Sequence, residues 1–269
     1  MSIDKSYTIS SDNKKKNAKI IIYIFVALEF VLYISFIYLD FSKNNSSLSS
    51  AIKYISILIC LLFVFFPVKK RSNLENTSIY DSKDILLLRL ALTFTFISDY
   101  FLLFTSEIIA GLLSFILVQL LYLVRIYNWK LDASLISISK NPLYLYFLPN
   151  IVITILILIP SFIFLKNINL DIMLTITLVA FYFISLIINS ISVLKISLKT
   201  RSKRAIIFAI GLFLFVLCDI NVGLFNLTYY IPINPFLYKK IHDITSVSMW
   251  LFYLPSQVLI SLSKYTQKS

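Results

Sequence analysis

Charged residues, glycine, cysteine and histidine are all scarce in this sequence of 269 residues. Only 14% of the residues are charged, and there are three glycines, two cysteines and one histidine. The single histidine, His242, excludes a histidine-based metal site or a Ser-His-Asp triad, and so few glycines exclude a glycine-rich phosphate loop. Cys60 and Cys218 lie within apolar stretches, where we expect them to pack between helices rather than to form a disulfide or bind a metal. We therefore expect neither a metal nor a cofactor.

Hydrophobic residues, in contrast, make up 59% of the chain, and the mean hydropathy is +0.86. A membrane-spanning helix needs roughly 20 predominantly apolar residues. The sequence supplies eight such stretches, at residues 20–39, 51–68, 85–104, 108–127, 143–165, 170–193, 205–227 and 244–262. This pattern predicts an all-α, polytopic integral membrane protein with about eight transmembrane helices, forming a single membrane domain over residues 20–263.

The distribution of basic residues predicts how the chain is oriented. Nineteen of the 25 lysines and arginines fall in alternate segments that we assign to the inside, five fall in the outer segments, and Arg89 lies within a helix. By the positive-inside rule both termini are cytoplasmic, with polar tails at residues 1–19 and 264–269. The first apolar stretch is too long for a signal-peptide core and lacks a small-residue cleavage site, so we expect it to stay as a spanning helix. Because the charge of +12 is spread over alternate loops, it does not predict nucleic-acid binding.

Two local features depart from the simple pattern of apolar stretches and loops. Pro149, Asn150 and Pro160 interrupt the fifth apolar stretch, where we expect a kink or a partial unwinding of the helix. His242 falls in the polar sequence FLYKKIHDIT, which we assign to an outer loop.

Four ionisable residues fall inside the predicted membrane segments: Glu29, Arg89, Asp99 and Asp219. Such residues are costly in a bilayer, and each is a functional hypothesis by default. Arg89 is close to the inner end of its helix and can extend to the interface, so a structural role fits it best. Glu29 is alone in its segment and either joins a cavity shared with other polar groups or pairs two helices.

Asp99 and Asp219 cannot reach the interface, because the aspartate side chain is short. Each lies 15 positions beyond the predicted inner end of its helix, counted from Asp84 and from Arg204, or roughly 22 Å along the axis. We expect them at similar depth, where two carboxyl groups facing one cavity give a protonated acid beside an ionised base. The alternative is that each aspartate only bonds a neighbouring helix.

Neutral polar side chains accompany these acids in the neighbouring segments. Amides and phenols can hold water or a lipid head group, and they can equally join helices. The candidates for the substrate-binding surface are Gln119, Tyr122, Asn221, Tyr253 and Gln257, together with Glu29.

Three sequence blocks carry a resemblance to a known family. In ALTFTFISDYFLLFTSEIIAGLLSFILVQLLYL, an aspartate late in one helix is followed by a glycine, a phenylalanine, a glutamine and a tyrosine. The second block is GLFLFVLCDINVGLF and the third is YLPSQVLI. In order and spacing these blocks resemble those of the YhhN-type lysoplasmalogenases, through Asp99, Gly111, Phe115, Tyr122, Gly211, Phe215, Asp219, Tyr253, Gln257, Leu259 and Ile260.

The sequence departs from the family pattern at three positions. Ser98 stands where the family usually has glycine, Cys218 where it has serine, and Gln119 where it has histidine. A glutamine does not titrate, so either catalysis does not depend on the imidazole or the activity of this chain is altered.

The resemblance implies an integral membrane hydrolase that cleaves the vinyl ether bond of a lysoplasmalogen, giving a fatty aldehyde and a glycerophospho-base. Asp99 and Asp219 would then share the acid and base roles, while Tyr122, Gln119 and Gln257 orient the head group or water. Its partners would be a lysophospholipid substrate and the surrounding lipids of a bacterial or eukaryotic membrane. A small-solute or proton-coupled transporter, or a catalytically silent lipid-binding protein, would explain the buried carboxylates as well.

Overall fold

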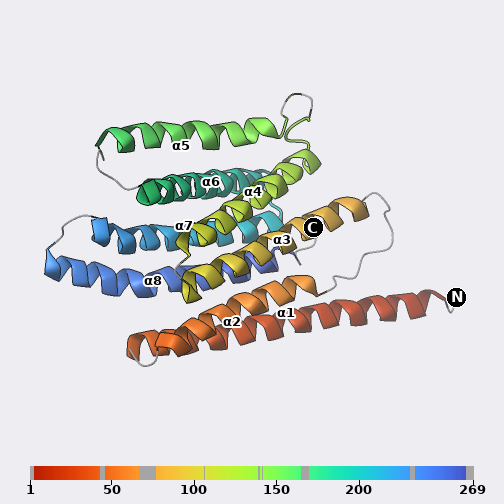
Figure 1. Ribbon diagram of the computed structural model, residues 1–269. Helices are drawn as coiled ribbons and strands as arrows, with labels where there is room; N and C mark the ends of the chain where they lie inside the picture. The colour runs from red at the N-terminus through yellow and green to blue at the C-terminus, as the bar shows by residue number, and fades with distance from the viewer. Residues whose placement is uncertain are drawn as a thin grey trace. The chain divides into compact units, whose positions relative to one another are not determined.

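The computed structural model describes residues 3–42, 46–66, 77–105, 107–138, 140, 142–164, 170–230 and 234–264. These residues form eight α-helices and short connections, with the helices drawn as coiled ribbons in Figure 1, and no strand occurs among them, which confirms the all-α class. The helices are α1 (Ile3–Ser42), α2 (Ser46–Phe65), α3 (Thr77–Phe104), α4 (Ile108–Asp132), α5 (Tyr144–Phe164), α6 (Leu170–Thr200), α7 (Lys203–Tyr230) and α8 (Pro235–Leu262).

Seven of these helices are long and apolar enough, over their described residues, to cross a bilayer. They are α1 to α4 and α6 to α8, and they confirm a multi-pass membrane architecture. The apolar part of α5 that is described, Tyr144–Leu156, is shorter than a span, so an eighth crossing stays a prediction, as does the orientation. The predicted C-terminal tail lies outside the described residues except for Lys264.

The helices extend beyond the predicted apolar stretches, because hydropathy marks the part that prefers lipid whereas backbone hydrogen bonding continues into polar flanks. α1 begins at Ile3 instead of near residue 20. His242, predicted in an outer loop, is within α8, and that prediction is wrong. The helix starts early because the Asn234 side chain caps it by accepting a hydrogen bond from the Phe236 amide, with Pro235 in the first turn.

The partial unwinding predicted in the fifth stretch does not occur, since α5 is helical from Tyr144 to Phe164. Pro149 lies near the beginning of this helix, and the Thr154 hydroxyl donates to the carbonyl oxygen of Asn150, one turn earlier, at 2.7 Å. The kink that was the other alternative stays a prediction.

The chain divides into two compact units, Met1–Ile59 and Cys60–Ser269, with the boundary inside α2. In the first unit, α1 and α2 are joined by polar contacts: the Lys53 ammonium pairs with Asp40 at 2.8 Å, and Ser56 donates to the buried Glu29 carboxylate. The prediction of one continuous membrane domain is not tested by this division.

In the second unit α7 packs along α8, α3 packs along α4, and α6 contacts α4, α5 and α7. The two helices α7 and α8 come close together at Gly211. A Cβ atom there would lie 2.9 Å from the Ile260 side chain and 3.2 Å from the Ser256 carbonyl oxygen. A glycine is thus needed at this crossing for the two backbones to come together. Cys60 and Cys218 are buried and unbridged, as expected of packing residues.

Candidate functional site

Asp99 is buried on α3 and receives a hydrogen bond from a helix far along the chain. Its Oδ2 atom accepts the hydroxyl proton of Tyr253 on α8, with 2.7 Å between the two oxygens. Only 3% of Asp99 is exposed, and 4% of Tyr253. Both residues are predicted from the sequence to belong to one site, and the structure brings them into direct contact.

Asp219, on α7, has a neighbouring tyrosine of its own. Tyr182 on α6 is buried and interacts electrostatically with the Asp219 carboxyl group. The geometry falls short of a full hydrogen bond, and within the described part of the chain neither the Tyr182 hydroxyl nor Asp219 Oδ2 has a hydrogen-bond partner. This buried carboxyl oxygen is consequently available to water or to a polar ligand.

The two aspartate–tyrosine pairs belong to one group of side chains. Tyr182 interacts electrostatically with Asp99 as well as with Asp219, and Cys218 does the same. We call Asp99, Tyr253, Asp219 and Tyr182 the aspartate–tyrosine cluster. The cluster holds two carboxyl groups: Asp99 accepts a hydrogen bond from a tyrosine hydroxyl, and Asp219 has an oxygen without a hydrogen-bond partner among the described residues. Two such groups can supply the acid and the base for proton transfers on one substrate.

Two phenylalanines of the recognised sequence blocks fill the space around this cluster. Phe215 lies with its ring centroid 5.4 Å from that of Tyr253 and 5.8 Å from that of Phe115, and Phe115 is 5.5 Å from Tyr182. These contacts are within the range of favourable aromatic packing. The rings hold both tyrosines in place and keep the surroundings of the carboxyl groups apolar.

The predicted binding residues Gln119 and Gln257 are fully buried but contact other groups. The Asn189 amide donates to the Gln119 side-chain oxygen at 3.1 Å and to its backbone oxygen at 2.9 Å, joining α6 to α4. Gln257 donates to Ser256 at 3.3 Å. Gln119 Nε2 and Gln257 Oε1 have no hydrogen-bond partner among the described residues, so each keeps one polar atom for water or ligand.

The remaining candidates interact with groups other than the two aspartates. Tyr122 is fully buried, packs edge-on against Phe208 at 5.2 Å and interacts electrostatically with Arg125. The Asn221 amide donates to Leu217 of its own helix at 2.8 Å. Glu29 belongs to the other unit, where its contact with Ser56 fits the helix-pairing alternative.

A second buried polar group, at one end of α3, α4, α7 and α8, was not predicted. Arg125 on α4 donates through Nε and Nη2 to the two carboxylate oxygens of Asp84, at 2.9 and 3.1 Å, and through Nη1 to Ser263 at 3.0 Å. Arg204 and the Trp129 indole also donate to Asp84. We call these five residues the arginine cluster, and its bidentate geometry ties together the ends of four helices.

Arg89 and Lys264 secure the end of α2 that belongs to the second unit. Arg89 donates to the carbonyl oxygens of Val64 and Phe65, at 3.2 and 3.3 Å, in line with the predicted structural role. Lys264 donates to Val64 at 2.8 Å as well. These cations satisfy carbonyl groups that have no partner within the helix.

Sequence reasoning missed Tyr182, Asp84 and the buried state of Arg125. Tyr182 had no local signal, because its role depends on how α6 crosses α7. Arg125 did have a local signal in the sequence. Tyr122, Arg125 and Trp129 recur at helical spacing on one face of α4, so the arginine lies on the same buried face as the two aromatic residues.

The comparisons with known proteins agree with the resemblance seen in the sequence blocks. A search of curated proteins gave no match, and neither did a search of solved structures. A family model described as the YhhN family matches residues 48–264, which include both the aspartate–tyrosine cluster and the arginine cluster. The match covers most of the chain, and this protein therefore belongs to the YhhN family.

Proposed function

We propose that the protein is a lysoplasmalogenase-type hydrolase of the membrane, which cleaves the vinyl ether bond of a lysoplasmalogen. The observation that carries this proposal is that Asp99 and Asp219, each with a tyrosine beside it, share the electrostatic partners Tyr182 and Cys218 in one largely buried cluster. Family membership supports the same class of reaction.

The reaction needs one proton donor and one group that directs water. Protonation of the alkenyl carbon remote from the ether oxygen leaves an oxocarbenium ion at the carbon bonded to that oxygen. Water adds to this carbon and loses a proton, giving a hemiacetal that collapses to a fatty aldehyde and the free glycerophospho-base. One carboxyl group supplies the first proton and the other takes the proton from water, so the pair ends the cycle with its protons conserved. We assign the two roles to Asp99 and Asp219 as a pair.

The tyrosines support these roles by position. The Tyr253 hydroxyl holds Asp99 in one orientation through its 2.7 Å hydrogen bond. Asp219 Oδ2 is buried without a hydrogen-bond partner among the described residues, which suits a carboxyl oxygen that receives water or substrate. An unpaired buried oxygen costs about 1–3 kcal/mol, so occupation of this position by a ligand is favoured.

The glutamine at position 119 is compatible with this scheme. Gln119 is anchored by Asn189, and its free Nε2 donor is suited to a neutral polar contact with substrate or water. Since neither amide titrates, the proton transfers are left to the aspartates.

The test is aldehyde formation by the purified, detergent-solubilised protein from a lysoplasmalogen, compared with the saturated alkyl ether analogue. We expect aldehyde from the vinyl ether alone, because the alkyl ether has no double bond to protonate. Asp99→Asn and Asp219→Asn should each lower the rate by at least about a hundredfold, the scale of a lost acid or base.

Asp243→Asn is the matched control, since Asp243 is a carboxylate on α8 with its side chain half exposed. It should keep wild-type turnover. Absence of aldehyde from folded wild-type protein would refute the enzymatic function, and undiminished rates in both cluster variants would refute the assignment to Asp99 and Asp219.

A further inference from the structure

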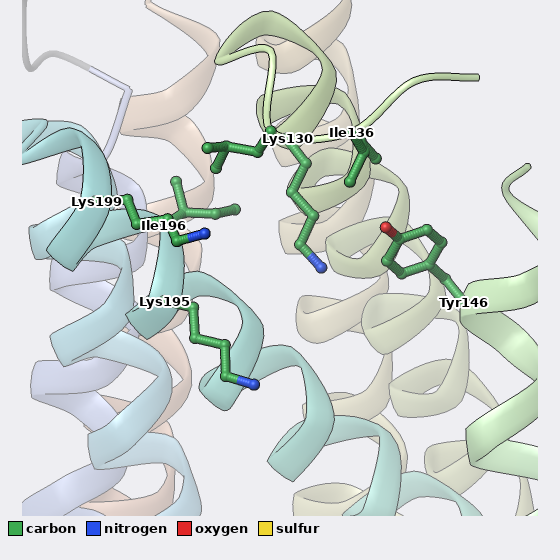
Figure 2. Close-up of a pocket in the computed structure, with 7 residues that line it drawn as sticks. Lys130, Ile136, Tyr146, Lys195, Ile196 and Lys199 are labelled. Atoms are coloured by element: carbon green, nitrogen blue, oxygen red, sulfur yellow. The ribbon is translucent and has the colours of Figure 1, made fainter. Parts of the chain in front are cut away.

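A cavity of about 160 Å³ lies between α4, α5 and α6, outside the aspartate–tyrosine cluster. Three lysines and a tyrosine supply its polar lining: Lys130 from α4, Tyr146 from α5, and Lys195 and Lys199 from α6. Figure 2 shows Lys130 and Tyr146 extending toward one another across the cavity, with the two α6 lysines on the opposite wall. The remaining lining is aliphatic, so the site is a cationic pocket with an apolar floor.

The positive charge of this lysine pocket has no counter-charge among the described residues that line it. No acidic side chain lines it, and no described carboxylate forms an ion pair with any of its three lysines. Lys130 instead places its ammonium 4.5 Å from the centre of the Tyr146 ring. Lys195 and Lys199 are one helical turn apart and share a face, an arrangement in which like charges repel.

Ordinary explanations account for part of this pattern. Lysines are abundant at the cytoplasmic ends of membrane helices, and Lys130 and Lys199 each lie in the last turn of a helix, where the helix dipole favours a cation. Neither effect requires lysines from two helices to line the same cavity. Their convergence points to an anion.

None of the residues that line the lysine pocket belongs to the aspartate–tyrosine cluster. Asn189 on α6 is bonded to Gln119 on α4, which marks the same level on both helices. Lys195 and Lys199 lie six and ten residues farther along α6, or roughly 9 and 15 Å beyond that contact. A ligand in the pocket is therefore displaced along the bundle from that contact.

We propose that the lysine pocket binds a phosphate group, either on a phospholipid head group or as inorganic phosphate. The volume corresponds to about five water molecules at roughly 30 Å³ each, which is enough for a tetrahedral oxyanion. Ammonium groups bind phosphate as point charges, and the Tyr146 hydroxyl adds a hydrogen-bond donor. Basic pockets between transmembrane helices recognise anionic head groups in the same way.

Two binding experiments on the full-length protein separate the sources. In nanodiscs of phosphatidylcholine, calorimetric titration with inorganic phosphate, with chloride as the reference anion, measures binding of the free ion. In nanodiscs containing phosphatidic acid, native mass spectrometry measures how much of this lipid stays bound relative to phosphatidylcholine. Saturation in the first experiment assigns the pocket to free phosphate, and selective retention in the second assigns it to a lipid head group.

Lys130→Gln and Lys199→Gln should each weaken the observed binding by about tenfold, the loss expected for one charge-assisted contact. Lys203→Gln is the matched control, because Lys203 is an exposed lysine at the start of α7 that does not line the cavity. It should bind within twofold of wild type, about the scatter of such measurements. The proposal is overturned if neither phosphate nor phosphatidic acid binds selectively to folded wild-type protein, or if Lys203→Gln weakens binding as much as the pocket variants.

Discussion

Asp84 and Arg204 form an ion pair between α3 and α7, and each stands fifteen positions before the aspartate of its own helix, Asp99 or Asp219. At about 1.5 Å per residue, both aspartates lie roughly 22 Å along their helices from this shared contact. The ion pair therefore explains how two acidic residues 120 positions apart in the sequence reach the same level of the bundle.

Replacing either tyrosine of the aspartate–tyrosine cluster should slow the reaction without abolishing it. Tyr253→Phe removes the hydrogen bond that orients Asp99, and Tyr182→Phe removes the hydroxyl beside Asp219. We expect aldehyde formation to fall by about tenfold in each variant, mainly in kcat, because Tyr253→Phe loses one buried hydrogen bond and Tyr182→Phe loses a polar neighbour of the Asp219 carboxyl group.

Tyr144→Phe serves as the control for both variants, because Tyr144 is 69% exposed on α5. It should leave kcat and KM unchanged. If the Tyr253 and Tyr182 variants turn over at the wild-type rate, the tyrosines have no part in positioning the aspartates.

Gly211 and Gly223 should respond in opposite ways to alanine. The Cβ of Gly211→Ala would come within 2.9 Å of the Ile260 side chain and 3.2 Å of its backbone nitrogen, whereas Gly223 has nothing within 4 Å. We expect Gly211→Ala to destabilise the fold by about 1–3 kcal/mol through overpacking. Gly223→Ala should be neutral or up to about 1 kcal/mol stabilising, since alanine favours the helix.

Thermal unfolding of the two glycine variants in one detergent checks this prediction. Equal melting temperatures for Gly211→Ala and Gly223→Ala would mean that α7 and α8 do not approach as closely as the structure shows.

Substituting a residue of the arginine cluster should destabilise the protein more than substituting an exposed charged residue. Arg125 is wholly buried and holds Asp84 through two hydrogen bonds. Removing one partner leaves the other charge buried, so Arg125→Gln should destabilise the protein by about 3–5 kcal/mol. Arg125→Lys should recover little of this, because an ammonium cannot form the bidentate contact.

A double-mutant cycle measures the coupling directly. Asp84→Asn combined with Arg125→Gln should be less destabilised than the two single effects together, because neither charge is then left alone. Strict additivity of the unfolding free energies would show that the two residues do not act as a pair.

Lys264 should make stability depend on pH in the alkaline range. Burial, and secondly the positive charge of Arg89, lower the pKa of Lys264 to about 8, whereas an unfolded lysine titrates near about 10.4. Between these values the unfolded chain holds the proton and the folded chain does not, so this residue makes stability rise with pH across that range. In Lys264→Met this contribution should vanish, which is checked by measuring the melting temperature of both proteins at several pH values from about 7 to about 10. If the melting temperatures of wild type and variant change with pH in the same way, the pKa of Lys264 is not lowered in the folded protein.

The existence of the helices was predictable from the sequence, but their ends were not. Long apolar runs identify the segments that prefer lipid, and the structure has a helix at each of them. The early start of α8 could have been predicted from Asn234 and Pro235, because a capping residue followed by a proline is typical of a helix start. Hydropathy alone does not predict helix in polar residues.

The candidate site was predictable in part for a similar reason. Asp99 and Asp219 stand out because carboxylates are rare in apolar segments. Tyr182 does not, since the chain has 17 tyrosines and only the crossing of α6 with α7 selects this one. Arg125 was counted as an inner-loop cation because its partner, Asp84, is 41 residues away.

The arginine cluster also has a consequence for the order in which the protein is made. Asp84 and Arg125 can meet as soon as α3 and α4 have been synthesised, but Arg204 follows Asp84 by 120 residues and Ser263 follows Arg125 by 138. The full set of hydrogen bonds therefore exists only after the last helix has left the ribosome. Until then, Asp84 and Arg125 of the nascent chain lack the hydrogen bonds that Arg204 and Ser263 form with them.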